Sequence, residues 1–406
     1  MITPRFLQIS TLAHYPASLL NRDDAGLAKR IPVGGVVRTR ISSQCLKAHW
    51  RKADVSYALD RIDPAISRSI RDRLVWQEEI AKPLFDEELP REAVIAVLRE
   101  VQKQFYAERE GGGRGRRPAG DDTGLGRNEI VVLGRPEIEY LREWTRRIVQ
   151  EAGDDEKRAT ELAREGWKKE RENFHAMRAE RRAAAGIDAA MFGRFVSGDR
   201  RARVDAAVHV AHAFTTHAEQ AETDWFTAVG DLEKEEQGAG AEHLNASELT
   251  SGLYYVYVVV DVPLLVSNIE GCARENWERA DRTLAAKATA NLLRLIATVS
   301  PGAKLGSTAP YDYAGFVLVE AGDLQPRTLA NAFVKPVHPM EADGDLYLAS
   351  ALRLADYVRK MDEMYGLGDG ALWRAHASRF TVEVPGSTRC DFERLVAEVE
   401  RLLREG

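Results

Sequence analysis

Short apolar runs rich in aromatic and β-branched residues predict the strands of a sheet. The clearest run is Tyr254–Asp261 (YYVYVVVD), and Phe6–His14 (FLQISTLAH) and Gly315–Glu320 (GFVLVE) share its character. Alternation of polar and apolar residues predicts a further strand over Val36–Ile41. Long stretches of other character separate these runs, so we expect one sheet assembled from distant parts of the chain.

Apolar residues at helical spacing predict an amphipathic helix over Asp281–Thr298 and a buried helix over Val204–Thr215 (VDAAVHVAHAFT). The order strand, helix, strand from Tyr254 to Glu320 is half of a split βαβ sheet. The N-terminal strands and the helix that follows them can supply the other half. The fold class expected is therefore α+β, with a ferredoxin-like sheet that is interrupted by insertions.

The residues from about Arg61 to Gly186 differ in character, because charged segments of helical pattern dominate them. We expect a helical insertion with little apolar surface of its own. Its segment Gly111–Asn128 is rich in Gly, Arg and Asp, which predicts a mobile loop. The helices expected in the insertion are Ala65–Val75, Arg91–Arg109, Glu137–Glu151 and Lys157–Ala185.

Composition narrows the class of protein. A chain of 406 residues can bury one large core or two modest ones. Its three cysteines stand far apart without a CxxC spacing, which favours neither a disulfide framework nor a cysteine zinc site. The N-terminus does not resemble a signal peptide, and no apolar stretch reaches the length of a membrane span. We therefore expect a cytoplasmic protein with no membrane partner.

The stretch Leu20–Lys52 carries the strongest local charge in the chain. Eight basic and two acidic side chains give it a net charge of +6, whereas the whole chain has a net charge of −6. Within this stretch Arg38 and Arg40 alternate along the strand predicted over Val36–Ile41, so both would lie on one face. A basic segment in an acidic chain indicates a surface suited to a polyanion.

A helix is expected directly after this strand, over Cys45–Ala58, and the segment Ser42-Ser43-Gln44 before it resembles a helix N-cap. Lys47 and Arg51 lie one helical turn apart and would share a side. Cations, small polar donors such as Gln44, and the N–H groups at a helix start together suit the phosphates of a single strand. A solvated charged surface fits the composition equally well.

Trp225 and Phe226 stand together within the polar stretch Thr216–Ser251. Two exposed aromatic side chains could stack on nucleobases, each base contributing roughly 1–3 kcal/mol. A small apolar cluster beneath a loop is the alternative, and from the residues alone it is favoured.

Metal or nucleophilic chemistry has weaker support. Asp23 and Asp24 are adjacent carboxylates that could hold Mg²⁺ beside a phosphate track, but no third ligand stands nearby, and shaping the loop is the favoured role. His212 and His217 are five residues apart, which does not suit a zinc pair on one helical face. We find no catalytic triad or kinase signature.

Several long stretches, in the same order, resemble the CasC-type proteins, which are the repeated backbone subunits of the type I-E CRISPR complex Cascade. The likeness covers most of the main body but is loose across the insertion. The stretches that carry it are Leu20–Arg51, Val204–Leu232, Ala246–Tyr255, the segment SPGAKLGSTAP that ends at Pro310, and Asn331-Ala332-Phe333.

The resemblance implies a palm that is a modified RNA-recognition-motif (ferredoxin-like) fold, a helical fingers insertion and a long thumb loop. The palm would comprise residues 1–60, 191–216 and 252–406, the last with the C-terminal helices. The fingers would comprise residues 61–190, and the thumb residues 217–251.

The resemblance also implies function and partners. Such a subunit belongs to the RAMP superfamily, binds CRISPR guide RNA (crRNA) for antiviral defence, and forms a helical oligomer with further copies of itself. It presents the guide to target DNA beside other Cascade subunits and a recruited helicase-nuclease. It needs no cofactor and is not an enzyme. The alternative is a metal-dependent RNase of the type III backbone kind, acting through Asp23 or Asp24.

Site residues follow from this resemblance by position. Those that would contact the guide phosphates are Arg22, Lys29, Arg40, Ser42, Gln44, Lys47 and Arg51. The thumb tip would be Trp225, Phe226 and Thr227, with Phe195 as the apolar wedge opposite it. Lys304 matches a family motif that is expected to lie near the RNA.

Overall fold

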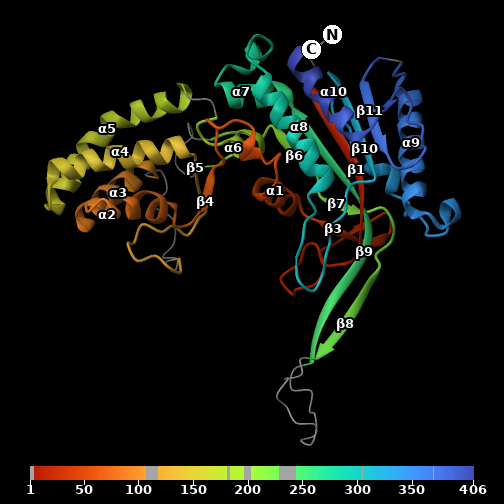
Figure 1. Ribbon diagram of the computed structural model, residues 1–406, viewed down its shortest axis with the longest axis horizontal. Coiled ribbons are helices and arrows are strands. Elements are labelled where there is room, and N and C mark those ends of the chain that lie inside the picture. Colours follow the sequence, from red (N-terminus) through yellow and green to blue (C-terminus); the bar gives the residue numbers. More distant parts are fainter. Residues whose placement is uncertain are drawn as a thin grey trace, which may run out of the picture. The chain divides into compact units, whose positions relative to one another are not determined.

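The computed structural model describes residues 4–106, 118–180, 183–195, 203–227, 244–303, 305–368 and 370–406. The chain forms two compact units (Figure 1). Unit 1 comprises Met1–Ala58, His209–Val260 and Thr289–Gly406, and unit 2 comprises Leu59–Val208 and Asp261–Ala288. The fold class is α+β, as predicted from the strand and helix patterns.

A large, mostly antiparallel sheet organises unit 1. Its strands lie in the order β12-β11-β10-β1-β9-β7-β3-β2, and β6 and β8 also pair with β9. The bounds are β1 Phe6–Ser18, β2 Arg30–Val33, β3 Val36–Ile41, β6 Val208–Val210, β7 Ala213–Thr215, β8 Ala221–Thr227, β9 Leu244–Asp261, β10 Phe316–Gly322, β11 Trp373–Ser378 and β12 Thr388–Arg389. The predicted strands are thus confirmed, and β1 lies between β9 and β10.

The helices of this unit bury apolar stripes against the sheet. They are α1 (Ser43–Lys52), α9 (Leu346–Tyr365), α10 (Phe392–Glu405) and the C-terminal part of α8 (Thr283–Thr298). Side chains of α9 join Tyr255 and Phe316 of the strands in one hydrophobic cluster, which includes Phe333 of the short helix η5 (Ala330–Phe333). The helix predicted over Asp281–Thr298 is confirmed as α8.

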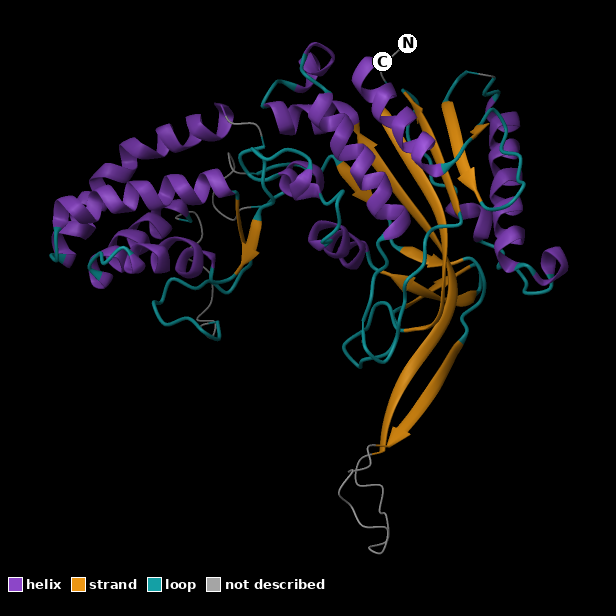
Figure 2. Cartoon of the chain, viewed as in Figure 1, coloured by secondary structure: helices purple, strands orange, loops and turns teal. Residues whose placement is uncertain are grey.

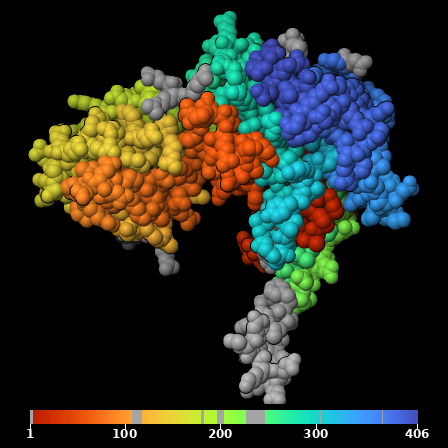
Figure 3. Space-filling model, in the orientation of Figure 1, coloured from red at the N-terminus to blue at the C-terminus, as the bar shows by residue number. Residues whose placement is uncertain are grey.

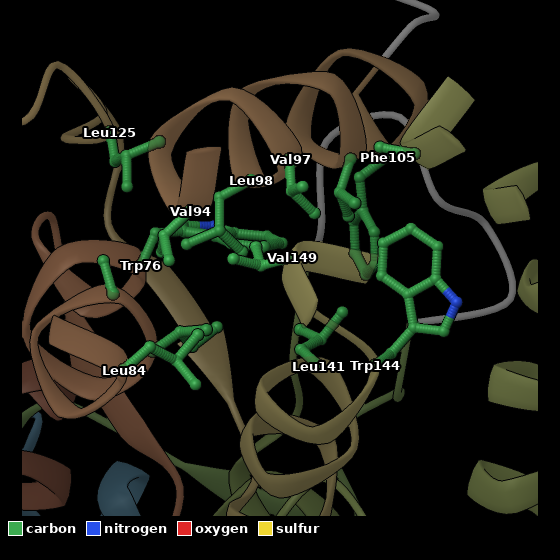
Figure 4. Close-up of a cluster of buried hydrophobic side chains, with 14 of the residues drawn as sticks. Trp76, Leu84, Val94, Val97, Leu98, Phe105, Leu125, Leu141, Trp144 and Val149 are labelled. Atoms are coloured by element: carbon green, nitrogen blue, oxygen red, sulfur yellow. The ribbon is translucent and has the colours of Figure 1, made fainter. Parts of the chain in front are cut away.

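Unit 2 is mainly helical. Its longer helices are α3 (Arg91–Phe105), α4 (Arg135–Ala152), α5 (Glu156–Glu180) and α7 (Val262–Glu270). Shorter elements are η1 Leu59–Arg61, β4 Ile70–Asp72, η2 Gln77–Ala81, α2 Lys82–Asp86, β5 Val131–Leu133, α6 Ile187–Phe192 and η4 Arg274–Arg279. The expectation of little apolar surface is wrong, since Trp76, Phe105, Trp144, Trp167 and Phe174 belong to one buried cluster. Figure 4 labels the first three of these side chains.

Charged residues hide this core in the sequence. Along α5 the buried positions Ala159, Ala163, Trp167 and Phe174 are separated by exposed charged residues, so the segment appears polar when it is averaged. The Trp144 and Trp167 rings meet edge to face with centroids 5.1 Å apart, a favoured geometry for aromatic pairs. Single apolar residues at helical spacing are sufficient to build an interior.

Several local predictions need correction. The helix expected over Val204–Thr215 is instead two short strands, β6 and β7, because both pair with the long strand β9. The helix expected over Ala65–Val75 contains β4. The helix expected over Cys45–Ala58 ends at Lys52 as α1.

The expected mobile loop Gly111–Asn128 is corrected in its second half. Leu125 is fully buried, and the side-chain amide of Gln77 donates to the carbonyl of Gly120 at 2.9 Å. The side-chain carbonyl of Gln77 accepts from the hydroxyl of Thr123 at 3.0 Å. These contacts hold residues 118–128 against unit 2, and residues 111–117 lie outside the described ranges.

Within the described residues, no helix combines the length and the apolar character that crossing a bilayer requires.

Candidate nucleic-acid interface

The basic stretch folds as a hairpin followed by a helix. β2 and β3 pair antiparallel through the turn Gly34-Gly35, and both glycines have positive φ. A Cβ on Gly34 would lie 1.6 Å from the carbonyl oxygen of Val334, so only glycine fits there. Ser42 is the N-cap of α1, and its hydroxyl accepts from the N–H of Cys45 at 3.3 Å, so the cap lies within the predicted segment Ser42-Ser43-Gln44.

Two arginines of this stretch are committed to the fold. Arg38 is fully buried, and its guanidinium donates to the carbonyls of Thr215 at 2.8 Å and Phe333 at 2.9 Å. Burial, and next the charge of Arg353, hold its pKa below the usual value for arginine. Arg38 therefore does not contribute to the basic surface that the sequence predicted. It instead secures β3 to β7 and η5.

Arg30 is neutralised at the base of the β8–β9 hairpin. It forms ion pairs with Glu219, at 2.6 Å, and with Glu248. Glu248 also accepts from the backbone N–H of Ala28 at 2.5 Å. These contacts join the start of β2 to β9, so Arg30 contributes little net charge to the surface.

Three other cations converge on one histidine. Arg40 Nη1 lies 3.0 Å from His212 Nδ1, and Arg40 Nε donates to the carbonyl of Arg30 at 3.2 Å. Burial lowers the pKa of His212, and the charges of Arg40, Lys29 and Lys47 lower it further. These side chains come from the start of the hairpin, from β3 and from α1. We call Lys29, Arg40, Lys47 and His212 the His212 cluster.

The remaining predicted phosphate contacts lie along the same loop, strand and helix. Arg22 and Gln44 are exposed, and Arg51 is half-buried on α1. Ser42 is buried, and its hydroxyl caps the helix. Its backbone N–H donates to the side chain of Asn21 at 2.9 Å, which fixes the strand-to-helix junction to the preceding loop.

The predicted thumb begins as a hairpin that extends the sheet. β8 pairs antiparallel with the first half of β9, with Trp225 opposite Ala246, and the pair runs outward from the other strands (Figure 2). The Trp225 side chain is 63% exposed, so it does not belong to a small buried cluster. Phe226 and Thr227 are the last residues of β8, next to the undescribed segment 228–243.

Phe195 belongs to unit 2 and is 68% exposed. The residue before it is anchored: Arg194 pairs with Val204 through both backbone hydrogen bonds and donates from Nη1 to Glu137 at 2.6 Å. Gly193 has φ +81° and packs against Ala206. The exposed ring of Phe195 therefore follows directly on a backbone segment that is held by buried contacts.

Lys304 lies outside the described residues, although its neighbours locate the segment that carries it. The N–H of Gly302 donates to His49 Nε2 at 3.2 Å, and the N–H of Ala303 donates to the carbonyl of Leu19 at 3.2 Å. The residues between α8 and β10, shown in cyan, border the red N-terminal residues at the surface (Figure 3). This segment is thus joined to α1 through His49.

Of the two adjacent carboxylates Asp23 and Asp24, Asp23 has a structural role in its loop. Asp23 Oδ1 accepts from the N–H groups of Ala25 at 2.9 Å and Leu27 at 3.0 Å, which closes the loop before β2. Among the described residues, no group of three or more His, Cys, Asp or Glu side chains is arranged to hold a metal ion. Burial also raises the pKa of the Cys45 thiol, which opposes a nucleophilic role.

His212 is the residue that the sequence analysis missed at this site. It was considered only as a zinc ligand, because its partner Arg40 lies 172 positions earlier in the chain. The pairing of Arg40 with Phe214 across β3 and β7 brings the two together. A short strand beside the basic hairpin would have been the necessary signal, and that segment had been predicted to be helical.

Comparison with known proteins places the chain among CRISPR-associated folds. A family model described as CT1975-like protein matches residues 7–398. A chain of a "CRISPR RNA-guided surveillance complex, pre-nicking" is 25% identical with a TM-score of 0.77, and the match covers 98% of this chain and 100% of that one. A chain of a "CRISPR RNA-guided surveillance complex" is 20% identical with a TM-score of 0.67, over 97% and 99% of the two chains. No curated protein matches the sequence.

Proposed function

The chain belongs to the CT1975-like protein family, and we propose on this basis that it is an RNA-binding backbone subunit of a CRISPR surveillance complex. In finer terms it is a CasC-type subunit of a type I-E Cascade complex. It oligomerises along the guide RNA and presents the guide for pairing with target DNA. The end-to-end match to a subunit of a solved surveillance complex supports this proposal.

The observation that carries the proposal is the His212 cluster. The charges of Lys29, Arg40 and Lys47, from a loop, a strand and a helix, lower the pKa of one exposed imidazole. The other arginines of the hairpin, Arg30 and Arg38, instead bind carboxylates and backbone carbonyls of the protein itself. Converging cations beside a helix start suit phosphate oxygens, which carry no sequence information. The protein would thus grip the backbone of any guide and leave sequence recognition to base pairing.

The hairpin supplies a second element of the proposal. Trp225 is exposed on a two-stranded extension of the sheet, a position from which an aromatic ring can stack on a base. In this proposal most of the RNA-recognition-motif palm lies in unit 1, the fingers lie in unit 2, and the β8–β9 hairpin is the start of the thumb. Residues 191–208 and 261–288, which were predicted for the palm, belong to unit 2. Further copies, other Cascade subunits and a helicase-nuclease are the proposed protein partners.

The proposed role is not catalytic. One carboxylate oxygen of Asp23 accepts hydrogen bonds from two backbone N–H groups of its own loop, which supports the role of shaping that loop. A metal-dependent RNase would need further oxygen ligands beside it. The contacts of Asp23 therefore favour the loop-shaping role over the RNase alternative.

The test is RNA affinity as a function of salt. Full-length protein freed of RNA is titrated with a fluorescent uridine homopolymer. Lys47→Ala should weaken binding and lower the slope of log affinity against log salt by about 0.7, the value of one phosphate contact on a single strand. The control is Lys360→Ala, which removes the same charge from α9, where Lys360 pairs with Asp356 at 2.7 Å. Equal slopes in the two variants would contradict the proposal.

A further inference from the structure

The imidazole of His212 has a defined hydrogen-bonding arrangement. Its Nδ1 lies 3.0 Å from Nη1 of Arg40. A guanidinium group only donates, so Nδ1 must be the acceptor of this bond. The neutral ring therefore carries its proton on Nε2, and His212 is exposed to solvent. The result is an N–H donor whose ring is oriented by an arginine.

Among the described residues, the side chains whose charges lower the pKa of this ring are cations. They are Arg40 on β3, Lys29 just before β2 and Lys47 on α1. Such surroundings repel a metal cation, and the proton on Nε2 blocks that nitrogen as a metal ligand. They favour an anion, and one with several acceptor oxygens can accept a hydrogen bond from Nε2 while its charge is attracted by the cations. A phosphate diester has this chemistry.

We propose that His212 binds a phosphate of the RNA backbone, donating from Nε2 while Arg40 orients the ring. The inference rests on the proposed RNA-binding function and adds to it a neutral donor among the cations. A histidine in this position also links binding to pH.

The direction of this linkage follows from the charges. Burial and then the three cations hold the pKa of His212 below its usual value, so the ring of the RNA-free protein is neutral at neutral pH. A bound phosphate offsets the positive field and raises that pKa. Between the lower pKa of the RNA-free protein and the higher pKa of the complex, binding therefore takes up a proton. That proton enters at Nδ1 and replaces the hydrogen bond from Arg40, while Nε2 continues to donate to the phosphate. Affinity should increase as pH falls through this window.

The experiment compares His212→Ala and His212→Gln with the wild type. Binding of a uridine homopolymer to the RNA-free, full-length protein is measured from about pH 8 down to about pH 5.5. His212→Ala should weaken binding at neutral pH roughly five- to thirtyfold, as expected for loss of a charge-assisted hydrogen bond. The wild type should gain more affinity than His212→Gln as pH falls. The control is His338→Gln, which replaces another exposed histidine, one that accepts from the N–H of Met340.

A second measurement uses the unaltered protein. In protein labelled with ¹⁵N-histidine, the His212 ring should show the Nε2–H tautomer, and the RNA should shift its resonances. The inference is overturned if RNA leaves these resonances unchanged, if inorganic phosphate shifts them and RNA does not, or if His212→Gln and wild type have parallel pH profiles. If Lys47→Ala weakens binding and His212→Ala does not, this inference alone fails. If no variant or wild type binds RNA, the proposed function fails with it.

Discussion

Removing the negative charge of Glu137 should strongly destabilise unit 2, because two buried arginines would lose their partner. Glu137 is fully buried and contacts two arginines: Arg178 donates to Oε1, and Arg194 donates to Oε2 at 2.6 Å. The arginine side chains are only 8% and 2% exposed. Burial opposes ionisation of Glu137, but the charges of Arg194 and Arg178 outweigh it and hold its pKa below the usual value.

Glu137→Gln removes the negative charge and keeps the shape. In the wild type the Glu137 carboxylate accepts a hydrogen bond from the N–H of Gly134 at 2.8 Å, at the start of α4. The side-chain carbonyl of the glutamine can still accept this bond. What is lost is the charge that two buried guanidinium groups contact. Removing one partner of a buried ionic group costs about 3–5 kcal/mol of the free energy of unfolding.

The matched control is Glu143→Gln, the same substitution on the same helix. Glu143 is 60% exposed and pairs with Arg146 at the surface, so its loss should cost at most about 1 kcal/mol. Because two units need not unfold together, the assay is hydrogen exchange resolved by segment, with amides of α4 and α5 reporting on unit 2. Equal exchange in the two variants would refute the reasoning.

Three further outcomes are expected. The difference in unfolding free energy between wild type and Glu137→Gln should be constant above about pH 4.3, the ordinary pKa of glutamate. It should shrink as pH falls through the lower pKa of Glu137 in the folded protein, and calorimetry at several pH values tests the direction of this change. Trp225→Ala should reduce the number of unstacked guide bases in the assembled complex without lowering its stability in isolation, and chemical probing that matches wild type would exclude the stacking role. Assembled complex with complementary RNA and Mg²⁺ should yield no regular cuts, and cuts that vanish in Asp23→Asn would favour the RNase alternative.

Elements with a strong local pattern could be predicted from the sequence. The strand over Val36–Ile41 has the predicted bounds, and α8 begins two residues after the predicted start. The prediction of a helix over Val204–Thr215 was wrong because alanines and valines in a short apolar run suit either a helix or a strand. Pairing with β9 decides that choice, and this contact between distant residues leaves no local pattern.

The three arginines of the basic hairpin show why charge alone cannot define a binding site. Arg30, Arg38 and Arg40 stand within eleven residues and look alike in the sequence. Carboxylates at Glu219 and Glu248 neutralise the first, and backbone carbonyls of β7 and η5 enclose the second. The partners of Arg30 and Arg38 come from parts of the chain about 180 to 300 positions away.

Arg40 differs from its neighbours because its partner is not an acid. It donates to His212, a neutral acceptor, so its positive charge stays uncompensated by that bond and adds to those of Lys29 and Lys47. Arg30 and Arg38 therefore fix the hairpin to its neighbours, while Arg40 adds positive potential at the surface beside His212. A phosphate-binding surface needs both, because a flexible cation would lose part of the gain to conformational entropy when the strand binds.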